Sequence, residues 1–121
     1  MDGLRIGQTR AGDVSVVTLS GRIDSTNAND VRGELTRLIS SGERSIVVDL
    51  GAVLYLTSAA FRALLVASEQ AARQAATLAL CSLSGAVREL FEMGGLLDVF
   101  KIYTSRDDAV RELGGRRLQA P

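Results

Sequence analysis

S-I-V-V-D-L, the stretch from Ser45 to Leu50, is apolar except for its first residue and one aspartate near its end. An apolar run of this length is typical of a strand that is buried on both faces, as in a parallel sheet. A second such run, T-L-A-L-C-S-L, spans residues 77–83, and the Ala- and Leu-rich residues 58–74 between the two runs are predicted to be a helix. A helix that joins two such strands makes a right-handed parallel crossover, so the pattern favours an α/β fold.

The residues before this unit predict a hairpin and a first helix. Residues 4–10 and 13–19 have the composition of strands, with Ala11-Gly12 as the turn between them. Apolar residues from Ala28 to Ile39 then fall at offsets 0, 3, 7, 10 and 11, which is one face of a helix. The chain therefore opens with two strands and one amphipathic helix.

The residues that follow predict two more helices and one more strand. Residues 85–93 are predicted to be a helix closed by Gly94-Gly95, and residues 99–103 a strand. The last helix is predicted to begin at Ser105 and to end at Gly114-Gly115. We expect a loop after Leu50 through Tyr55, and a flexible tail over residues 116–121.

These segments together predict one α/β domain over residues 1–115, with the element order β-β-α-β-α-β-α-β-α. We expect a mixed, mostly parallel sheet of about five strands with about four helices, and the first strand antiparallel at an edge. The length of 121 residues, with 46% apolar and 23% charged residues, suits one globular core.

Charge and cysteine content exclude several classes of partner. Fourteen basic residues balance fourteen acidic residues, so no overall field draws the chain to nucleic acid or to an anionic membrane. No apolar run approaches the roughly 18 residues of a membrane span, and the N-terminus lacks the order of a signal peptide. Cys81 is the single cysteine and cannot form an internal disulfide. We expect a cytoplasmic protein without membrane insertion.

The side-chain chemistry argues against catalysis. The absence of histidine removes Ser-His-Asp and Cys-His mechanisms and most zinc sites. No phosphate-binding loop of the form G-x-x-x-x-G-K-S/T is present, and Cys81 lies in an apolar strand, where it is expected to pack in the core. We therefore expect a protein-binding module with no catalytic residue, cofactor or metal, rather than a small enzyme or a nucleotide binder.

Ser58 stands at the predicted start of the long helix. Serine at such a place most often serves as the N-cap. An exposed serine there can also carry phosphate, because the positive end of the helix dipole favours the added negative charge. Asp24 has a plain structural interpretation as well, as the cap of a turn before the first helix.

The helix over residues 58–74 also carries a mixed stripe. Its members are Arg62, Val66, Glu69, Gln70 and Arg73, while Phe61, Leu64, Leu65 and Ala71 can face the core. Val66 is thus an apolar residue in a polar setting. The stripe is either a solvated face with one incidental valine or a surface on which a partner docks.

Four segments of the chain resemble the STAS domains of bacterial anti-anti-sigma factors, from Leu4 to Leu113. They are L-S-G-R-I-D at 19–24, I-V-V-D-L at 46–50, Y-L-T-S-A-A-F-R-A-L-L at 55–65, and C-S-L-S-G-A-V-R-E-L-F-E-M-G-G-L at 81–96. In that family the loop before the second helix carries a serine that a partner kinase phosphorylates, and Ser58 falls on it. Asp24 falls on the acidic residue beside that serine.

The resemblance implies partner switching. The unphosphorylated chain would bind an anti-sigma factor with serine kinase activity and so free a sigma factor; phosphorylation would break that complex and a serine phosphatase would restore it. The implied partner-binding residues are Asp24, Tyr55, Thr57, Ser58, Arg62, Val66 and Arg73. The alternative keeps the fold but makes the chain a constitutive adaptor of a signalling scaffold or a transporter complex, with Ser58 only a cap.

The chain departs from the family pattern beside Ser58. Thr57 stands where many members have aspartate, and Ala60 and Phe61 replace the usual glycine and leucine. If the glycine allows a partner backbone to approach closely, the methyl group of Ala60 is expected to weaken that contact.

Overall fold

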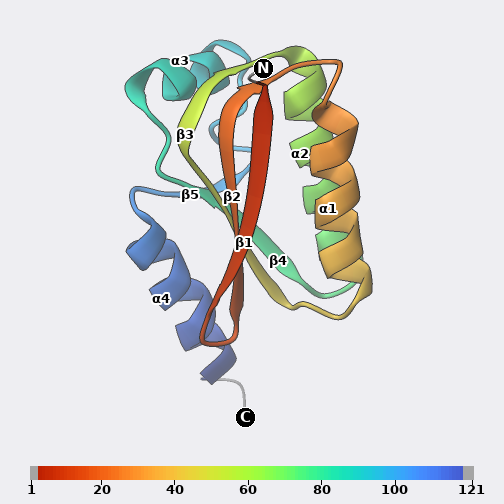
Figure 1. Ribbon diagram of the computed structural model, residues 1–121. Helices are drawn as coiled ribbons and strands as arrows, with labels where there is room; N and C mark the ends of the chain where they lie inside the picture. The colour runs from red at the N-terminus through yellow and green to blue at the C-terminus, as the bar shows by residue number, and fades with distance from the viewer. Residues whose placement is uncertain (1–2, 119–121) are drawn as a thin grey trace.

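Alternating strands and helices build one mixed sheet with helices on both faces (Figure 1). The structure, a computed structural model, describes residues 3–118. The sheet order is β1-β2-β3-β4-β5, in which β1 runs antiparallel to β2 and every other neighbouring pair is parallel. The elements in chain order are β1 (Leu4–Ala11), β2 (Val14–Ile23), α1 (Ala28–Ser40), β3 (Ser45–Leu56), α2 (Ser58–Arg73), β4 (Thr77–Cys81), α3 (Gly85–Met93), β5 (Lys101–Tyr103) and α4 (Arg106–Leu118).

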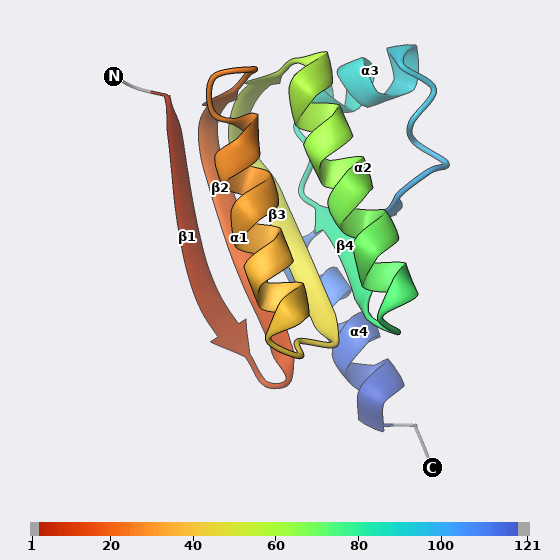
Figure 2. The ribbon, with the colours of Figure 1, turned by 90° about the vertical axis from the view of Figure 1, so that its right-hand side faces the viewer.

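The sheet divides the core into two layers, one covered by α1 and α2 and the other by α4. Helices α1 and α2 lie side by side over one face of the sheet, and α4 lies on the opposite face (Figures 1 and 2). The larger apolar cluster fills the α1/α2 side and also takes in Phe91 of α3, whose ring meets Phe61 of α2 edge to face at 4.9 Å. The smaller cluster, under α4, includes Val47, Cys81 and Leu113. Strand β3 contributes to both clusters, which explains its continuous apolar run.

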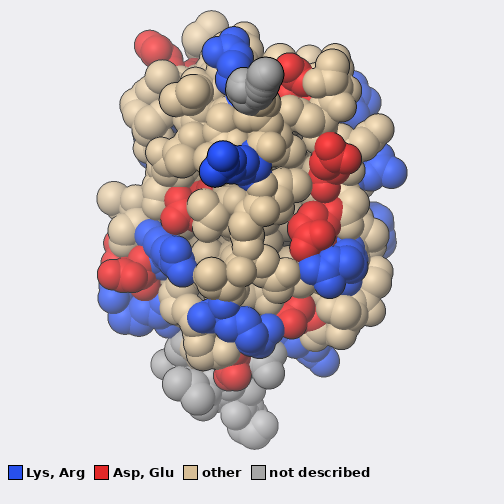
Figure 3. Space-filling view, in the orientation of Figure 1, with Lys and Arg blue, Asp and Glu red and all other residues tan. Residues whose placement is uncertain are grey.

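The predicted fold class and sheet are confirmed. The chain forms one α/β domain whose sheet is mostly parallel, with β1 antiparallel at an edge. Cys81 is fully buried as predicted, and burial raises the pKa of its thiol. Among residues 3–118 no helix is long and apolar enough to span a membrane. Acidic and basic side chains are interspersed on the face shown in Figure 3, in keeping with the balanced charge.

Several predicted boundaries are wrong. Strand β2 continues past residue 19 to Ile23, β4 ends at Cys81 and not at residue 83, and β5 begins at Lys101 and not at residue 99. Residues 51–55 are not a loop, because β3 continues to Leu56 in register with β2. The last helix does not end at Gly114-Gly115 but runs on to Leu118. Leu113 and Ala109 anchor this helix on the sheet, and such packing outweighs the roughly 1 kcal/mol that a glycine costs inside a helix. Flexibility of residues 116–121 stays a prediction, and 119–121 lie outside the described residues.

Gly21 allows the two central strands to stay paired up to their ends. Strand β2 makes two register irregularities against β3, the second between Gly21 and Arg22. Gly21 has φ +98°, a left-handed conformation that residues with a Cβ rarely adopt, and an added Cβ would lie 2.0 Å from the carbonyl oxygen of Gly3. Only glycine therefore fits where the start of β1 pairs with this irregular part of β2.

Replacing Gly21 by alanine should destabilise the domain by about 2–4 kcal/mol, since strain in φ and a backbone clash add together. Gly7→Ala on β1 is the matched control: Gly7 has no atom within 4 Å of an added Cβ, so its effect should stay within about 0.5 kcal/mol. Urea unfolding followed by circular dichroism measures both. Equal stability of the two variants would show that the left-handed conformation at Gly21 is dispensable.

Candidate functional site

The ends of β2 and β3 bring two predicted site segments together. Ile23 and Leu56 are the last paired residues of the two strands. One residue later, the N–H of Thr57 donates to the carbonyl of Ile23 at 3.0 Å, and the Thr57 hydroxyl donates to the same oxygen at 3.4 Å. Asp24 follows Ile23, and Ser58 follows Thr57, the two residues that these bonds join. The turn at Asp24 and the start of α2 are thus held at the same edge of the sheet.

Asp24 organises the turn that leads into α1. Its carboxylate accepts hydrogen bonds from the Thr26 hydroxyl at 2.5 Å and from the Thr26 N–H at 2.9 Å. These bonds lower the pKa of the Asp24 carboxyl below its usual value. Asn27 closes the turn from the other side, because its side-chain oxygen accepts from the Asp24 N–H. The predicted role of Asp24 in a turn is confirmed, whereas a direct contact with a partner stays a prediction.

Ser58 is the first residue of α2, and its side chain is exposed. The N-cap is Thr57, in extended conformation, so the prediction that Ser58 is the N-cap is wrong by one residue. The Thr57 hydroxyl does not cap the helix but turns to Ile23, and the first turn of α2 carries no acidic residue. The positive end of this helix is therefore neither capped by a side chain nor neutralised by one.

Two of the three residues that depart from the family pattern, Ala60 and Phe61, point into the protein. Ala60 is only 1% exposed and belongs to the larger apolar cluster. Phe61 packs edge to face on Phe91 of α3. The expectation that the methyl group of Ala60 hinders a partner is therefore wrong, because this methyl group faces the core and not the surface.

Exposed apolar side chains precede Ser58 on β3. Leu54 is 68% exposed and Tyr55 is 41% exposed. The guanidinium of Arg22, on the neighbouring strand, lies 5.2 Å from the centre of the Tyr55 ring, a cation–π contact that fixes the ring. Leu54 is not among the predicted site residues, since a residue in a predicted loop gives no sign of which way its side chain points.

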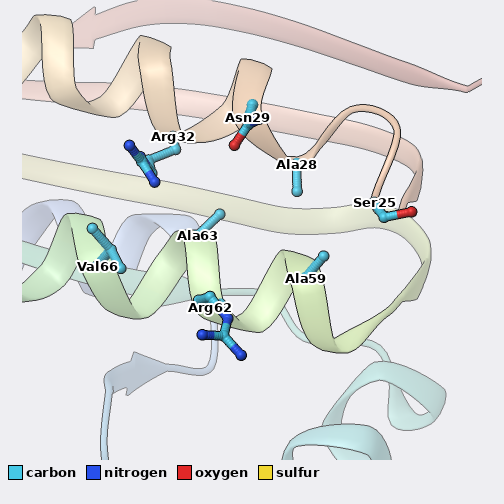
Figure 4. A pocket seen from close by; sticks show the side chains of 8 residues that line it. All are labelled: Ser25, Ala28, Asn29, Arg32, Ala59, Arg62, Ala63 and Val66. Atoms are coloured by element: carbon cyan, nitrogen blue, oxygen red, sulfur yellow. The ribbon is translucent and has the colours of Figure 1, made fainter.

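A groove separates α1 from α2 beside the site (Figure 4). It has a volume of about 130 Å³. Arg62 and Val66 line it as parts of α2, and Val66 is half-buried there, neither in the core nor free at the surface. The remaining lining residues are Ser25, Ala28, Asn29, Arg32, Ala59 and Ala63. Three of these, Ser25, Asn29 and Arg32, are residues with polar side chains that the sequence argument missed.

Arg73 lies apart from the other predicted site residues. It is the last residue of α2, so about 1.5 Å of rise per residue places it roughly 22 Å along the helix from Ser58. Between them, the Gln70 side-chain oxygen accepts a hydrogen bond from the Thr36 hydroxyl of α1 at 3.1 Å. The polar stripe of α2 is therefore partly turned toward α1. The structure does not bring Arg73 near Ser58.

Known proteins share both the sequence pattern and the fold. BtrV of Bordetella bronchiseptica, which its name describes as a candidate anti-sigma factor antagonist, is 33% identical over 106 residues, covering 88% of this chain and 91% of BtrV. An anti-sigma factor antagonist from Mycobacterium paratuberculosis is 25% identical, with a TM-score of 0.84 over 93% of this chain and 96% of that chain. Unphosphorylated SpoIIAA of Bacillus, 18% identical, shares the fold with a TM-score of 0.76 over 93% of this chain and 97% of its own.

The family model for the STAS domain matches residues 7–109, a range that contains the Asp24 turn, the start of α2 and the groove between α1 and α2. With this match and the sheet order and helices described above, the chain belongs to the STAS domain family.

Proposed function

We propose that this chain is an anti-sigma factor antagonist that phosphorylation of Ser58 switches off. In its unphosphorylated form it binds an anti-sigma factor with serine kinase activity and thereby releases a sigma factor. That kinase transfers phosphate to the Ser58 hydroxyl, the complex dissociates, and a serine phosphatase removes the phosphate. The name and the 33% identity of BtrV support the antagonist role.

The observation that carries the switch is the setting of Ser58. Its hydroxyl is exposed at the first position of α2, on a helix end that has neither a side-chain cap nor an acidic residue in its first turn. A phosphate there adds about −1.5 to −2 charges next to the positive end of the helix dipole. The domain can hold this charge without unfolding, while a partner docked on the same surface meets added bulk and must desolvate the phosphate.

The partner surface in this proposal consists of Leu54, Tyr55, Thr57, Ser58, Arg62 and Val66. It combines two exposed apolar residues of β3 with the exposed start of α2 and the rim of the groove. Interfaces gain most of their affinity from a few residues near the centre of the contact, among which tryptophan, tyrosine and arginine are enriched. Tyr55 and Arg62 are residues of these kinds, and they stand on either side of Ser58 along the chain.

Val66→Glu should weaken binding of the anti-sigma factor by about 1–3 kcal/mol, because it replaces a small apolar contact with the partner by a charged side chain. Its effect on unfolding should be small, since Val66 lies outside both core clusters. Val99→Glu is the matched control, because Val99 is an exposed valine beside the C-terminal half of α2. Calorimetric titration and urea unfolding of both variants test this. A large loss of stability in Val66→Glu would place the residue in the core instead.

Phosphorylation of Ser58 should lower the affinity for the anti-sigma factor about 5- to 150-fold, a coupling of about 1–3 kcal/mol. Ser58→Ala should bind and resist phosphorylation, and Ser58→Asp should bind weakly. Ser40→Ala, at an exposed serine that ends α1, should behave like the wild type.

The assay first captures the anti-sigma factor from the native host with the wild-type chain and identifies it by mass spectrometry. The purified pair is then incubated with ATP, the phosphosite is mapped, and the affinity is measured before and after. Phosphate found only on another residue refutes the switch at Ser58. Unchanged affinity with phosphate on Ser58 would instead favour the constitutive adaptor.

A further inference from the structure

Arg32 and Arg62 line the groove between α1 and α2. Arg32 comes from α1, and its guanidinium lies between the two helices, whereas Arg62 comes from α2, and its guanidinium is turned away from α1 (Figure 4). Within residues 3–118, neither side chain makes a hydrogen bond or an ion pair. Three other arginines form ion pairs, Arg10 with Glu43, Arg37 with Glu34 and Arg111 with Asp108, whereas Arg5, Arg44, Arg73 and Arg88 form none with the described residues. The two groove arginines therefore hold unused hydrogen-bond donors.

The rest of the groove offers no compensating charge. None of its eight lining residues is acidic, although the chain as a whole has as many acidic as basic residues. Its apolar part consists of Ala28, Ala59, Ala63 and Val66, and its neutral polar groups are those of Ser25 and Asn29. A volume of about 130 Å³ admits one side chain and not a helix. The groove suits an aliphatic stem that ends in an anionic group.

We propose that this groove receives a glutamate or aspartate side chain from an acidic segment of the partner protein, with Arg32 and Arg62 binding its carboxylate from the two helices. Arginine presents paired N–H donors that match a carboxylate, and in this proposal the Arg62 side chain turns toward α1 to join Arg32 at the bound carboxylate. The identity of the partner as an anti-sigma factor rests on the proposed function, whereas the preference of the groove for a carboxylate does not.

Arg32 gives the sharpest test, because it lies outside the partner surface defined around Ser58. Arg32→Glu should lower the affinity for the captured anti-sigma factor about tenfold, and raising the salt concentration should weaken the wild-type complex more than the variant complex. Arg44→Glu is the matched control. Arg44 is also exposed, lies between α1 and β3, and does not line the groove, so its affinity should stay within about twofold of wild type.

A second measurement needs no partner. The 121-residue chain, labelled with nitrogen-15, is titrated with glutarate and, as a neutral control, with glutaramide. The side-chain Nε–H signals of Arg32 and Arg62 should shift together and saturate with glutarate only, and Arg32→Gln should remove the shift at Arg62. Equal shifts at Arg44 would show nonspecific attraction and overturn the proposal.

The two measurements separate the proposals. If an anti-sigma factor binds the wild type and Arg32→Glu equally well, the groove proposal is overturned and the antagonist function stands. If no anti-sigma factor binds the wild type, the antagonist function fails, and the glutarate titration alone decides whether the groove binds carboxylates.

Discussion

The backbone pairing between the last residues of β2 and β3 is the constraint on which the site depends. Ile23 and Leu56 close the parallel ladder, and the Thr57 N–H then donates to the Ile23 carbonyl. Because Thr57 is also the N-cap of α2, this single bond fixes the start of the helix against the turn at Asp24. If β3 ended at Leu50, a loop would stand between the sheet and Ser58, and loops of that kind vary in position far more than paired strands.

The ladder reaches this far because β2 tolerates irregular pairing. The second of its two register shifts against β3 lies where Gly21 takes a left-handed conformation directly against the Gly3 carbonyl. Such irregularities occur where a strand must redirect a side chain or a chain end. Here they precede Arg22, which lies over the Tyr55 ring, and the Asp24 turn. A backbone feature at the edge of the sheet therefore arranges side chains on both sides of Ser58.

The sequence could predict what depends on local periodicity and not what depends on pairing between distant segments. The helix over 28–39 and the buried run at 46–50 follow from apolar spacing alone, and both are present. The continuation of β3 through Gly51 to Leu56 has no such signal, since its side chains are exposed in no regular alternation and only the neighbouring strand keeps it extended. The groove cannot be predicted from the sequence for the same reason, because Arg32 and Arg62 are 30 residues apart and line one groove only when α1 packs on α2.

Arg62 lies next to Ser58 on α2 and also lines the groove, so phosphorylation of Ser58 can act on the groove as well. Arg62 follows Ser58 by four residues on α2, and side chains with this spacing lie on the same face of a helix as neighbours. An anionic group on Ser58 is therefore the kind of charge that the unpaired guanidinium of Arg62 attracts, and the order of anion before cation along the helix is the favourable one. An Arg62 side chain that turns to Ser58 is no longer available to a carboxylate in the groove. The fold need not change for this to happen, because the elements that hold the site lie in the sheet and the core.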